Sequence, residues 1–203
     1  MARAFIALGA NLGDRLGQLR SAARALGEVG DGGDEIVARS SVWETAAIGP
    51  PPDYLNAVVA LESSLSPRAL LERLLRIEAA HGRRRGVDAA IGANAPRTLD
   101  LDLLLYDDQV LVEDGLELPH PRMHQRAFVL GPLCEIAADL RHPLLHCSMG
   151  ELYAALPSGQ VARRIADNFA YVSAVQELGG RRPAAARIST CKGPLPGLYP
   201  NRK

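Results

Sequence analysis

The fold is decided by the stretch Arg97-Thr98-Leu99-Asp100-Leu101-Asp102-Leu103-Leu104-Leu105. Successive side chains of a β-strand point to opposite faces of a sheet, so this alternation predicts a strand over residues 98–106 with one apolar and one acidic face. The leucines at 99, 101, 103 and 105 are expected to face helices. Asp100 and Asp102 would share the opposite face, about 6–7 Å apart along the strand.

The acidic pair predicts a site for divalent cations. Two carboxylates at this separation repel each other by roughly 2–3 kcal/mol at an effective dielectric constant near 20, and bound cations would turn that cost into a binding site. Magnesium prefers such hard oxygen ligands and completes its octahedron with water and phosphate oxygens. A strand face that is acidic only because it is exposed is the alternative, because a bare Asp-x-Asp pattern is short.

Hydrophobic periodicity on either side of this strand predicts a split βαβ arrangement. The other expected strands cover residues 2–8, 35–45, 56–64 and 109–112. Helices are expected over 14–29, 66–81, 126–138 and 150–156, and Ser66-Pro67 supplies a helix cap followed by a proline at the first helical position. The order predicts an α+β, ferredoxin-like βαββαβ sandwich, an antiparallel sheet with helices on one face and the active site on the other.

Length and composition predict one globular domain with an appendage. The chain has 203 residues, of which 47% are hydrophobic and 23% charged, as in ordinary globular proteins. Residues 1–157 are expected to form the domain. Residues 158–203 would be a C-terminal extension that is weakly ordered or holds a short helix near 165–178. No stretch approaches the roughly 20 apolar residues of a membrane span, and we expect a cytoplasmic protein without a membrane partner.

Charge and cysteine usage exclude several classes of protein. The 23 acidic and 23 basic residues balance, which argues against a nucleic-acid partner. The three cysteines are scattered and suggest neither zinc nor a disulfide framework. The only lysines are Lys192 and Lys203, so a phosphate site in the main body must use arginine. A GxxxxGK[ST] loop and a protein-kinase lysine are both absent.

Two basic motifs flank the acidic strand. The run from His81 to Gly86 opens a long loop over 82–95 that ends at Pro96-Arg97, and its arginines could bind phosphate oxygens in pairs. A solvated basic turn is the alternative. His120 lies between Pro119 and Pro121, which would hold it stiffly for a nucleotide contact. An ordinary turn histidine would show the same pattern.

A fourth motif, Pro52-Asp53-Tyr54-Leu55-Asn56, could recognise a heterocycle. Tyr54 offers a flat face, and the amide of Asn56 offers one donor and one acceptor to a pyrimidinone edge. A tyrosine at the start of a strand and a turn asparagine are the alternative reading of these five residues.

Together the motifs resemble the 6-hydroxymethyl-7,8-dihydropterin pyrophosphokinase family. The resemblance covers most of the chain up to about residue 137, in the order and near the spacing of that family. It rests on the blocks Ile6–Gly13, Asp53–Asn56, Pro96–Asp102, Pro119-His120 with Arg126 and Phe128, and Pro132–Ala137. The family usually has a basic residue and a tryptophan just before the segment that corresponds to Ala95-Pro96-Arg97. This chain has Ala93 and Asn94 there, which would alter the contacts of the loop.

The resemblance implies an enzyme that transfers the diphosphate of ATP to a hydroxymethylpterin and releases AMP, in folate biosynthesis. Two Mg²⁺ ions would be held by Asp100 and Asp102 and would bridge the ATP phosphates. The catalytic group would be Arg83, Arg97, Asp100 and Asp102. The ATP-binding set would be Glu78, Arg83, Arg85, Arg97, His120 and Arg126, with Glu78 in a supporting role.

On the pterin side, the resemblance implies that Tyr54 and Phe128 sandwich the ring while Thr45 and Asn56 bond its edge. The small-molecule substrates would be ATP and 6-hydroxymethyl-7,8-dihydropterin, and functional proximity to dihydropteroate synthase is a further expectation. Three other readings stay open: a metal-dependent phosphohydrolase on the same aspartates, an inactive paralogue, and a ferredoxin-like nucleic-acid-binding module. The last would stack bases on sheet aromatics, whereas only 4% of this chain is aromatic.

Overall fold

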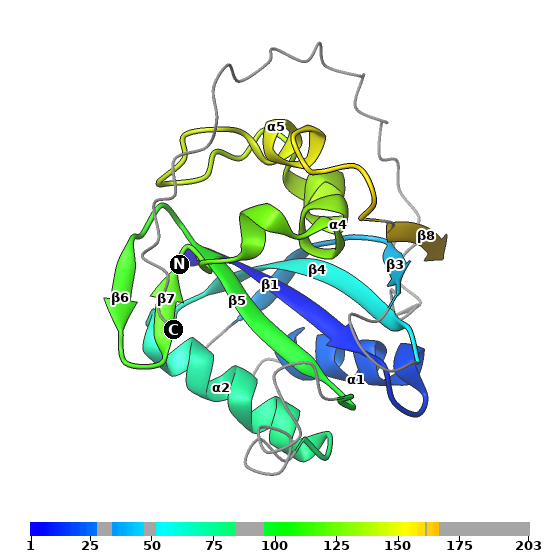
Figure 1. Cartoon of the computed structure of the whole chain (residues 1–203). Coiled ribbons are helices and arrows are strands. Elements are labelled where there is room, and N and C mark those ends of the chain that lie inside the picture. Colours follow the sequence, from blue (N-terminus) through cyan, green and yellow to red (C-terminus); the bar gives the residue numbers. More distant parts are fainter. Residues whose placement is uncertain (28–33, 47–51, 84–95, 161, 167–203) are drawn as a thin grey trace, which may run out of the picture.

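A computed structural model describes residues 1–27, 34–46, 52–83, 96–160 and 162–166, and these contain the predicted βαββαβ order (Figure 1). The first part of the chain forms β1 (Ala2–Ala10), α1 (Arg15–Gly27), β2 (Glu35–Arg39), β3 (Val42–Thr45), β4 (Tyr54–Ser63), α2 (Pro67–Ala80) and β5 (Asp100–Tyr106). The second part forms the hairpin β6 (Leu111–Glu113) and β7 (Leu116–Leu118), a 3-10 turn (Met123–Gln125), α4 (Ala127–Ala137), α5 (Met149–Ala154) and β8 (Ala162–Ala166). The predicted fold class is confirmed.

The main sheet is antiparallel, with its strands in the order β5-β1-β4-β3-β8, and β2 also pairs with β4. The single strand predicted over 35–45 is wrong in one respect, because it is broken into β2 and β3 at Ser40 and Ser41. There the Ser40 hydroxyl accepts a hydrogen bond from the Val58 N–H (2.9 Å), and the Ser41 N–H donates to Glu135 on α4 (2.6 Å). Side chains therefore replace ladder bonds at the break.

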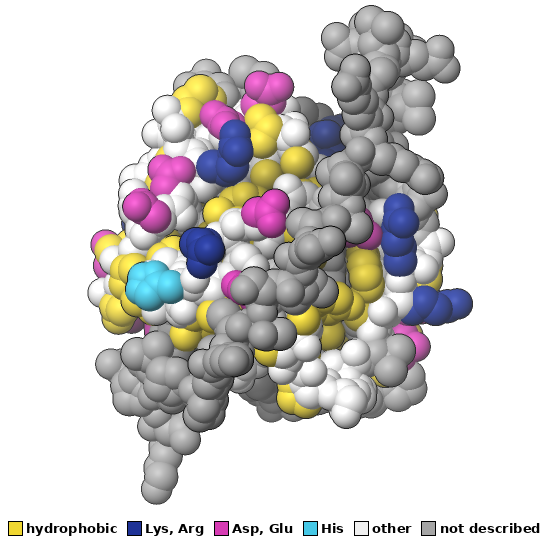
Figure 2. Space-filling model, turned by 90° about the horizontal axis from the view of Figure 1, so that it is seen from above, with side chains coloured by type: hydrophobic (Ala, Val, Ile, Leu, Met, Phe, Trp, Pro, Cys, Tyr) yellow, Lys and Arg dark blue, Asp and Glu magenta, His cyan; other side chains and the backbone are white. Residues whose placement is uncertain are grey.

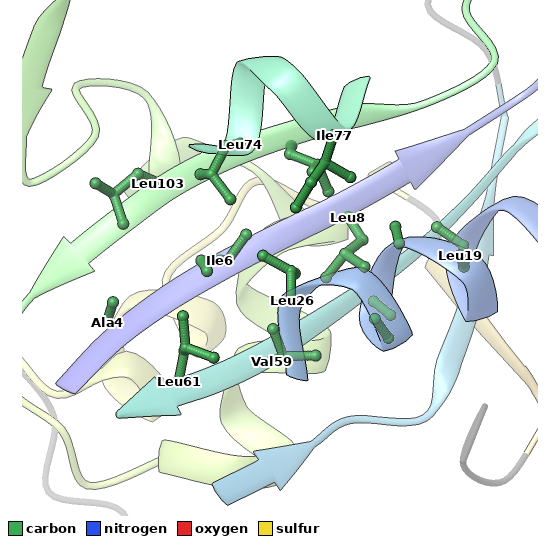
Figure 3. Packing of buried hydrophobic residues seen from close by; sticks show 14 of the residues in the cluster. Ala4, Ile6, Leu8, Leu19, Leu26, Val59, Leu61, Leu74, Ile77 and Leu103 are labelled. Atoms are coloured by element: carbon green, nitrogen blue, oxygen red, sulfur yellow. The ribbon is translucent and has the colours of Figure 1, made fainter. Parts of the chain in front are cut away.

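The principal core lies between the sheet and the two helices α1 and α2. Ala4, Ile6 and Leu8 point from β1 toward these helices and are almost fully buried (Figure 3). Each fully buried leucine or isoleucine stabilises the fold by about 1.5–3 kcal/mol relative to an exposed one. Ser66 caps α2 as predicted, since its hydroxyl accepts from the Ala69 N–H. Because α1 and α2 cover this side of the sheet, the site must lie on the opposite side.

The opposite face of the sheet is covered at one end by α4 and α5 (Figure 1). A second buried cluster forms there, and it includes Phe5 of β1, Val58 of β4 and Leu130 of α4. Leu105 also belongs to this cluster, so its predicted place on the same face as Leu99, Leu101 and Leu103 is wrong. A β-bulge between Phe5 and Ile6 leaves one extra residue in β5, and the alternation of its side chains reverses after that point.

The hairpin and the C-terminal strand extend the predicted plan. The sequence indicated one short strand near 109–112, and the structure adds its partner β7. Beyond residue 157, Ala162–Ala166 pair with β3 as β8, so the helix expected over 165–178 does not begin at Ile165. Residues 167–203 lie outside the described residues. None of the helices within the described ranges is long and apolar enough to cross a membrane.

A buried histidine in the loop between α4 and α5 has a lowered pKa. His142 is completely buried, and its Nδ1 atom accepts hydrogen bonds from the backbone N–H groups of Leu144 and Leu145, both at 3.3 Å. Burial, followed by the neighbouring His124 and His146, lowers the pKa of His142 from 6.5 to about 4. At neutral pH the ring is therefore uncharged, with its proton on Nε2.

We expect this histidine to make the fold sensitive to mild acid. Because the pKa of His142 is lower in the folded than in the unfolded chain, the unfolded chain takes up the proton first, and stability is lost as pH falls from about 6.5 toward 4. The expected loss in free energy of unfolding between pH 7 and pH 5 is about 2 kcal/mol. Denaturant titrations of the wild type and His142→Asn at both pH values check this. The asparagine oxygen can replace Nδ1 as an acceptor, so the variant should lose this part of the slope, and equal slopes would contradict the assignment.

Candidate active site

The floor of the site is a row of residues across three neighbouring strands. Asp100 of β5 lies opposite Gly9 of β1, which in turn lies opposite Asn56 of β4. A Cβ atom on Gly9 would lie 3.5 Å from Asn56 Oδ1 and 3.8 Å from Asp100 Cβ. The missing side chain of Gly9 therefore leaves open the space between the acidic group and the asparagine.

The acidic pair meets arginines from three segments of the chain. Asp100 accepts from Arg83, which follows α2, and from Arg97 Nη1 at 3.0 Å. Asp102 Oδ2 lies 3.9 Å from Arg126 Nη1, at the start of α4. Three of the four predicted arginines thus surround the pair, and Arg85 lies outside the described residues.

Electrostatics at the pair favour a bound cation. Burial, followed by the charge of Asp100, raises the pKa of Asp102 from 3.8 to about 6, although the three arginines act in the opposite direction. Burial alone would lower the pKa of Arg83, but the carboxylates of Asp100 and Glu78 raise it. The site thus holds a carboxylate that is poorly compensated, and additional positive charge would stabilise its ionised form.

Glu78 holds Arg83 in place from below. Its carboxylate is almost fully buried (1% exposed) and accepts from the Leu101 N–H at 2.8 Å and from Arg83. It therefore links the end of α2 to the start of β5 and directs the guanidinium of Arg83 to Asp100. This burial is consistent with a supporting role, whereas direct contact between Glu78 and ATP stays a prediction.

His120 and Arg126 form the side of the site near α4. The backbone N–H of His120 donates to the Leu104 carbonyl (2.8 Å), and the ring Nδ1 of His120 accepts from the backbone N–H of Arg122 (3.2 Å). Burial, with the charges of Arg126 and Arg122, lowers the pKa of His120 to about 4, so the ring is neutral with its proton on Nε2. The guanidinium of Arg126 lies over the ring of Phe128, 5.3 Å from its centre. Phe128 is thereby oriented by a cation–π contact.

Three of the four residues predicted for the pterin lie beyond Gly9, on β3 and β4, and the fourth, Phe128, lies on α4. The Asn56 side chain donates to the Thr45 hydroxyl at 2.9 Å, and Tyr54 pairs with Thr45 in the strand register. Asn56 is buried (5% exposed), and Tyr54 and Phe128 are half-buried. The structure thus brings Thr45, Tyr54 and Asn56 together, and the sandwich between Tyr54 and Phe128 stays a prediction.

Two residues that hold this site together were not predicted. Asn11 accepts from the Arg97 N–H (2.7 Å) and donates to the Pro52 carbonyl (3.1 Å), so it joins the segments before β5 and β4. Arg15 donates to the Asp53 carbonyl (2.7 Å). A polar residue directly after an apolar strand that contains a glycine, as Asn11 is, was a usable signal of a functional position. Nothing in the local sequence distinguishes Arg15 from other arginines on helices.

The donor set of the acidic pair fits magnesium. Asp100 and Asp102 supply hard carboxylate oxygens on one face of the sheet, next to the space left by Gly9. The described part of the chain contains no group of three or more His, Cys, Asp or Glu residues that could hold a metal ion. A site with two carboxylates suits magnesium, which usually takes one or two from the protein and the rest from water and substrate phosphates.

Comparison with known proteins agrees with this geometry. Residues 5–138 match the family model described as 7,8-dihydro-6-hydroxymethylpterin-pyrophosphokinase. The 2-amino-4-hydroxy-6-hydroxymethyldihydropteridine pyrophosphokinase of Haemophilus influenzae is 38% identical over 172 residues, which are 84% of this chain and 94% of that protein. The protein of the same name from Synechocystis sp. is 45% identical over 141 residues, 69% of each chain.

The fold is similar to that of a solved Plasmodium falciparum protein. The crystal structure of Plasmodium falciparum HPPK-DHPS aligns with a TM-score of 0.54 at 14% identity, over 76% of this chain. This chain spans only 43% of the solved chain, and the likeness concerns the fold alone. From the match over residues 5–138 and the two close relatives, the chain belongs to the 7,8-dihydro-6-hydroxymethylpterin-pyrophosphokinase family.

Proposed function

We propose that this chain transfers the terminal diphosphate of ATP to the hydroxymethyl group of 6-hydroxymethyl-7,8-dihydropterin and releases AMP. It is an ATP-dependent pyrophosphokinase of folate biosynthesis. The observation that carries the proposal is the row from Asp100 across Gly9 to Asn56, which sets a charged half beside a half suited to a heterocycle. Both substrates would then meet above Gly9.

The charged half would position the triphosphate. Asp100 and Asp102 would hold two magnesium ions, which neutralise phosphate charge when bound. Arg83 and Arg97 now pair with Asp100, and they would turn to the phosphate oxygens once cations replace them there. Arg126, and Arg85 from the loop, would complete this shell. His120, neutral with its proton on Nε2, can donate a hydrogen bond on the nucleotide side.

The other half would hold the pterin. Asn56 and Thr45 would bond its edge, and Tyr54 and Phe128 would cover its faces. The hydroxymethyl oxygen would attack the β-phosphorus in line and lose its proton to solvent. A new P–O bond forms, the bond from the β-phosphorus to the α-phosphate oxygen breaks, and AMP leaves with that oxygen. Catalysis then consists of positioning and charge stabilisation, so no covalent protein nucleophile is required.

Product analysis with single substrates tests this function. With ATP, magnesium and 6-hydroxymethyl-7,8-dihydropterin, AMP should form in a one-to-one ratio with the pterin consumed, and ATP alone should stay intact. Phosphate release from ATP without pterin would favour a phosphohydrolase, and no turnover with both substrates would favour an inactive paralogue. Either result would refute the proposal.

The nucleic-acid reading has little support on the face that carries α4 and α5. Among the described residues in Figure 2, acidic, basic and hydrophobic side chains are mixed over this face. A binding surface for phosphate backbones would instead concentrate positive charge. The name HPPK-DHPS of the similar solved chain supports our further expectation of functional proximity to dihydropteroate synthase.

A further inference from the structure

Two facing rows of side chains join α4 to β3, behind the residues proposed for the pterin. Residues three and four apart lie on one face of a helix, so Phe128, Gly131 and Glu135 form one stripe of α4. Alternate residues share one face of a strand, so Trp43 and Thr45 form the facing row on β3. Each row has a residue proposed to contact the pterin at one end, Phe128 on α4 and Thr45 on β3. At the other end lie residues that join the helix to the strand.

Glu135 binds the far end of the β3 row with both carboxylate oxygens. Oε2 accepts from the Ser41 N–H at 2.6 Å, and Oε1 accepts from the indole N–H of Trp43 at 3.1 Å. Ser41 is buried (4% exposed), so its N–H depends on this acceptor. One side chain thus fixes two points of the strand against the helix.

Close packing fixes the middle of the same interface. A Cβ atom on Gly131 would lie 3.1–3.3 Å from three atoms of the Trp43 ring, so the ring lies directly on the helix backbone. Only glycine permits this approach without movement of the ring. The next step along each row is Phe128 on the helix and Thr45 on the strand. The separation of helix and strand at Trp43 is therefore transmitted to these two residues.

We propose that Glu135 is a positioning residue for the pterin: with Trp43 and Gly131 it sets how far Phe128 lies from Thr45 and Asn56. This inference rests on the proposed function, because it concerns the width of the same site. The mechanism assigns no contact between Glu135 and either substrate. Its effect passes through the helix and the strand. ATP should be less affected, because most residues proposed to bind it lie on β5 and next to α2, and only Arg126 contacts Phe128.

The C-terminal strand reinforces this interface. Arg164 of β8 lies 3.3 Å from Glu135 Oε1 and donates to the Ser41 hydroxyl at 2.7 Å. On the other face of β3, Arg163 and Arg15 share the carboxylate of Glu44, at 2.9 and 3.3 Å. Arg15 also donates to the Asp53 carbonyl, next to Tyr54. Through Glu135 on one face of β3 and Glu44 on the other, β8 therefore supports the segments that carry Phe128 and Tyr54.

Calorimetric binding with Glu135→Gln tests the inference. The neutral amide presents an NH₂ group to one of the two donors, which loses its acceptor. We expect the Kd for 6-hydroxymethyl-7,8-dihydropterin, measured with a non-hydrolysable ATP analogue and magnesium, to rise on the order of tenfold. The Kd for the ATP analogue alone should change less than about twofold, and kcat at saturating pterin should change less than KM for the pterin.

Matched variants in α5 separate positioning from general stability. Glu151→Ala removes one half of the capping box of α5, and Gly150→Ala adds a methyl group 3.5 Å from the Ala138 carbonyl, both away from β3. Neither should change pterin binding, whereas Gly131→Ala should weaken it, as Glu135→Gln does. If Glu135→Gln does not fold, Gly131→Ala and Trp43→Phe carry the test.

The outcomes distinguish this inference from the proposed function. An unchanged pterin Kd in Glu135→Gln, or an equal loss for pterin and ATP, would overturn the positioning role while wild-type AMP formation upheld the enzyme. A wild-type chain that makes no AMP from both substrates would refute the function directly. A selective loss of pterin binding in both Glu135→Gln and Gly131→Ala supports the inference.

Discussion

Replacing Asp102 by alanine should lower kcat for AMP formation at least about 100-fold, because it removes a carboxylate proposed to hold the cations that stabilise the transferring phosphates. The loss should persist at high magnesium and saturating ATP. Initial rates of AMP release, measured as a function of magnesium, check this. Asp108→Ala is a suitable control, since Asp108 is an exposed carboxylate beyond the end of β5.

The carboxylate of Asp102 should lower the stability of the folded chain while it supports activity. Because the pKa of Asp102 is raised to about 6, its charged form is disfavoured in the folded chain, and the destabilisation grows as pH rises through that value. Asp102→Asn should therefore unfold at the same or a higher temperature than the wild type at pH 7 without magnesium. Near-normal turnover in either variant, or a clear loss of stability in Asp102→Asn, would contradict this account.

The acidic strand was predictable because its pattern is local. With apolar residues and aspartates in alternation, the pattern permits only one assignment of side chains to the two faces of the strand. The structure places both carboxylates next to arginines, as expected. The alternation fails after Leu103, at a bulge that depends on pairing with β1. Pairing between distant strands is absent from a local pattern, so Leu105 could not be placed correctly.

The contacts that close the site are long-range, and the sequence alone did not reveal them. Asn11 and Arg97 are 86 residues apart, and Arg164 and Ser41 are 123 apart. β8 is a strand because β3 offers it an unpaired edge, whereas its own residues have no strong strand period. Motifs thus predicted which side chains carry the chemistry, while the supports of those side chains required the three-dimensional arrangement.

Arg83→Ala should have an even larger effect on turnover, on the order of 1,000-fold in kcat, if Arg83 stabilises the transferring phosphoryl group as arginines do in related chemistry. In this structure its side chain is only 10% exposed and pairs with both Asp100 and Glu78. Its removal therefore takes away a positive charge from the phosphates and also leaves the carboxylate of Glu78 buried without its cation. Single-turnover rates of AMP release measure the first effect.

The second effect can be separated from the first by a double variant. Breaking a buried ion pair costs about 3–5 kcal/mol, so Arg83→Ala alone should unfold at lower denaturant concentration than the wild type. Adding Glu78→Gln removes the orphaned charge and keeps an oxygen for the Leu101 N–H, so stability should largely return. Activity should not return, because the guanidinium is still missing. Arg68→Ala, which breaks an exposed pair with Glu113, is the matched control. It should leave kcat within about twofold and the free energy of unfolding within about 1 kcal/mol of the wild type. If the double variant regained turnover together with stability, Arg83 would be a structural arginine and its place in catalysis would be lost.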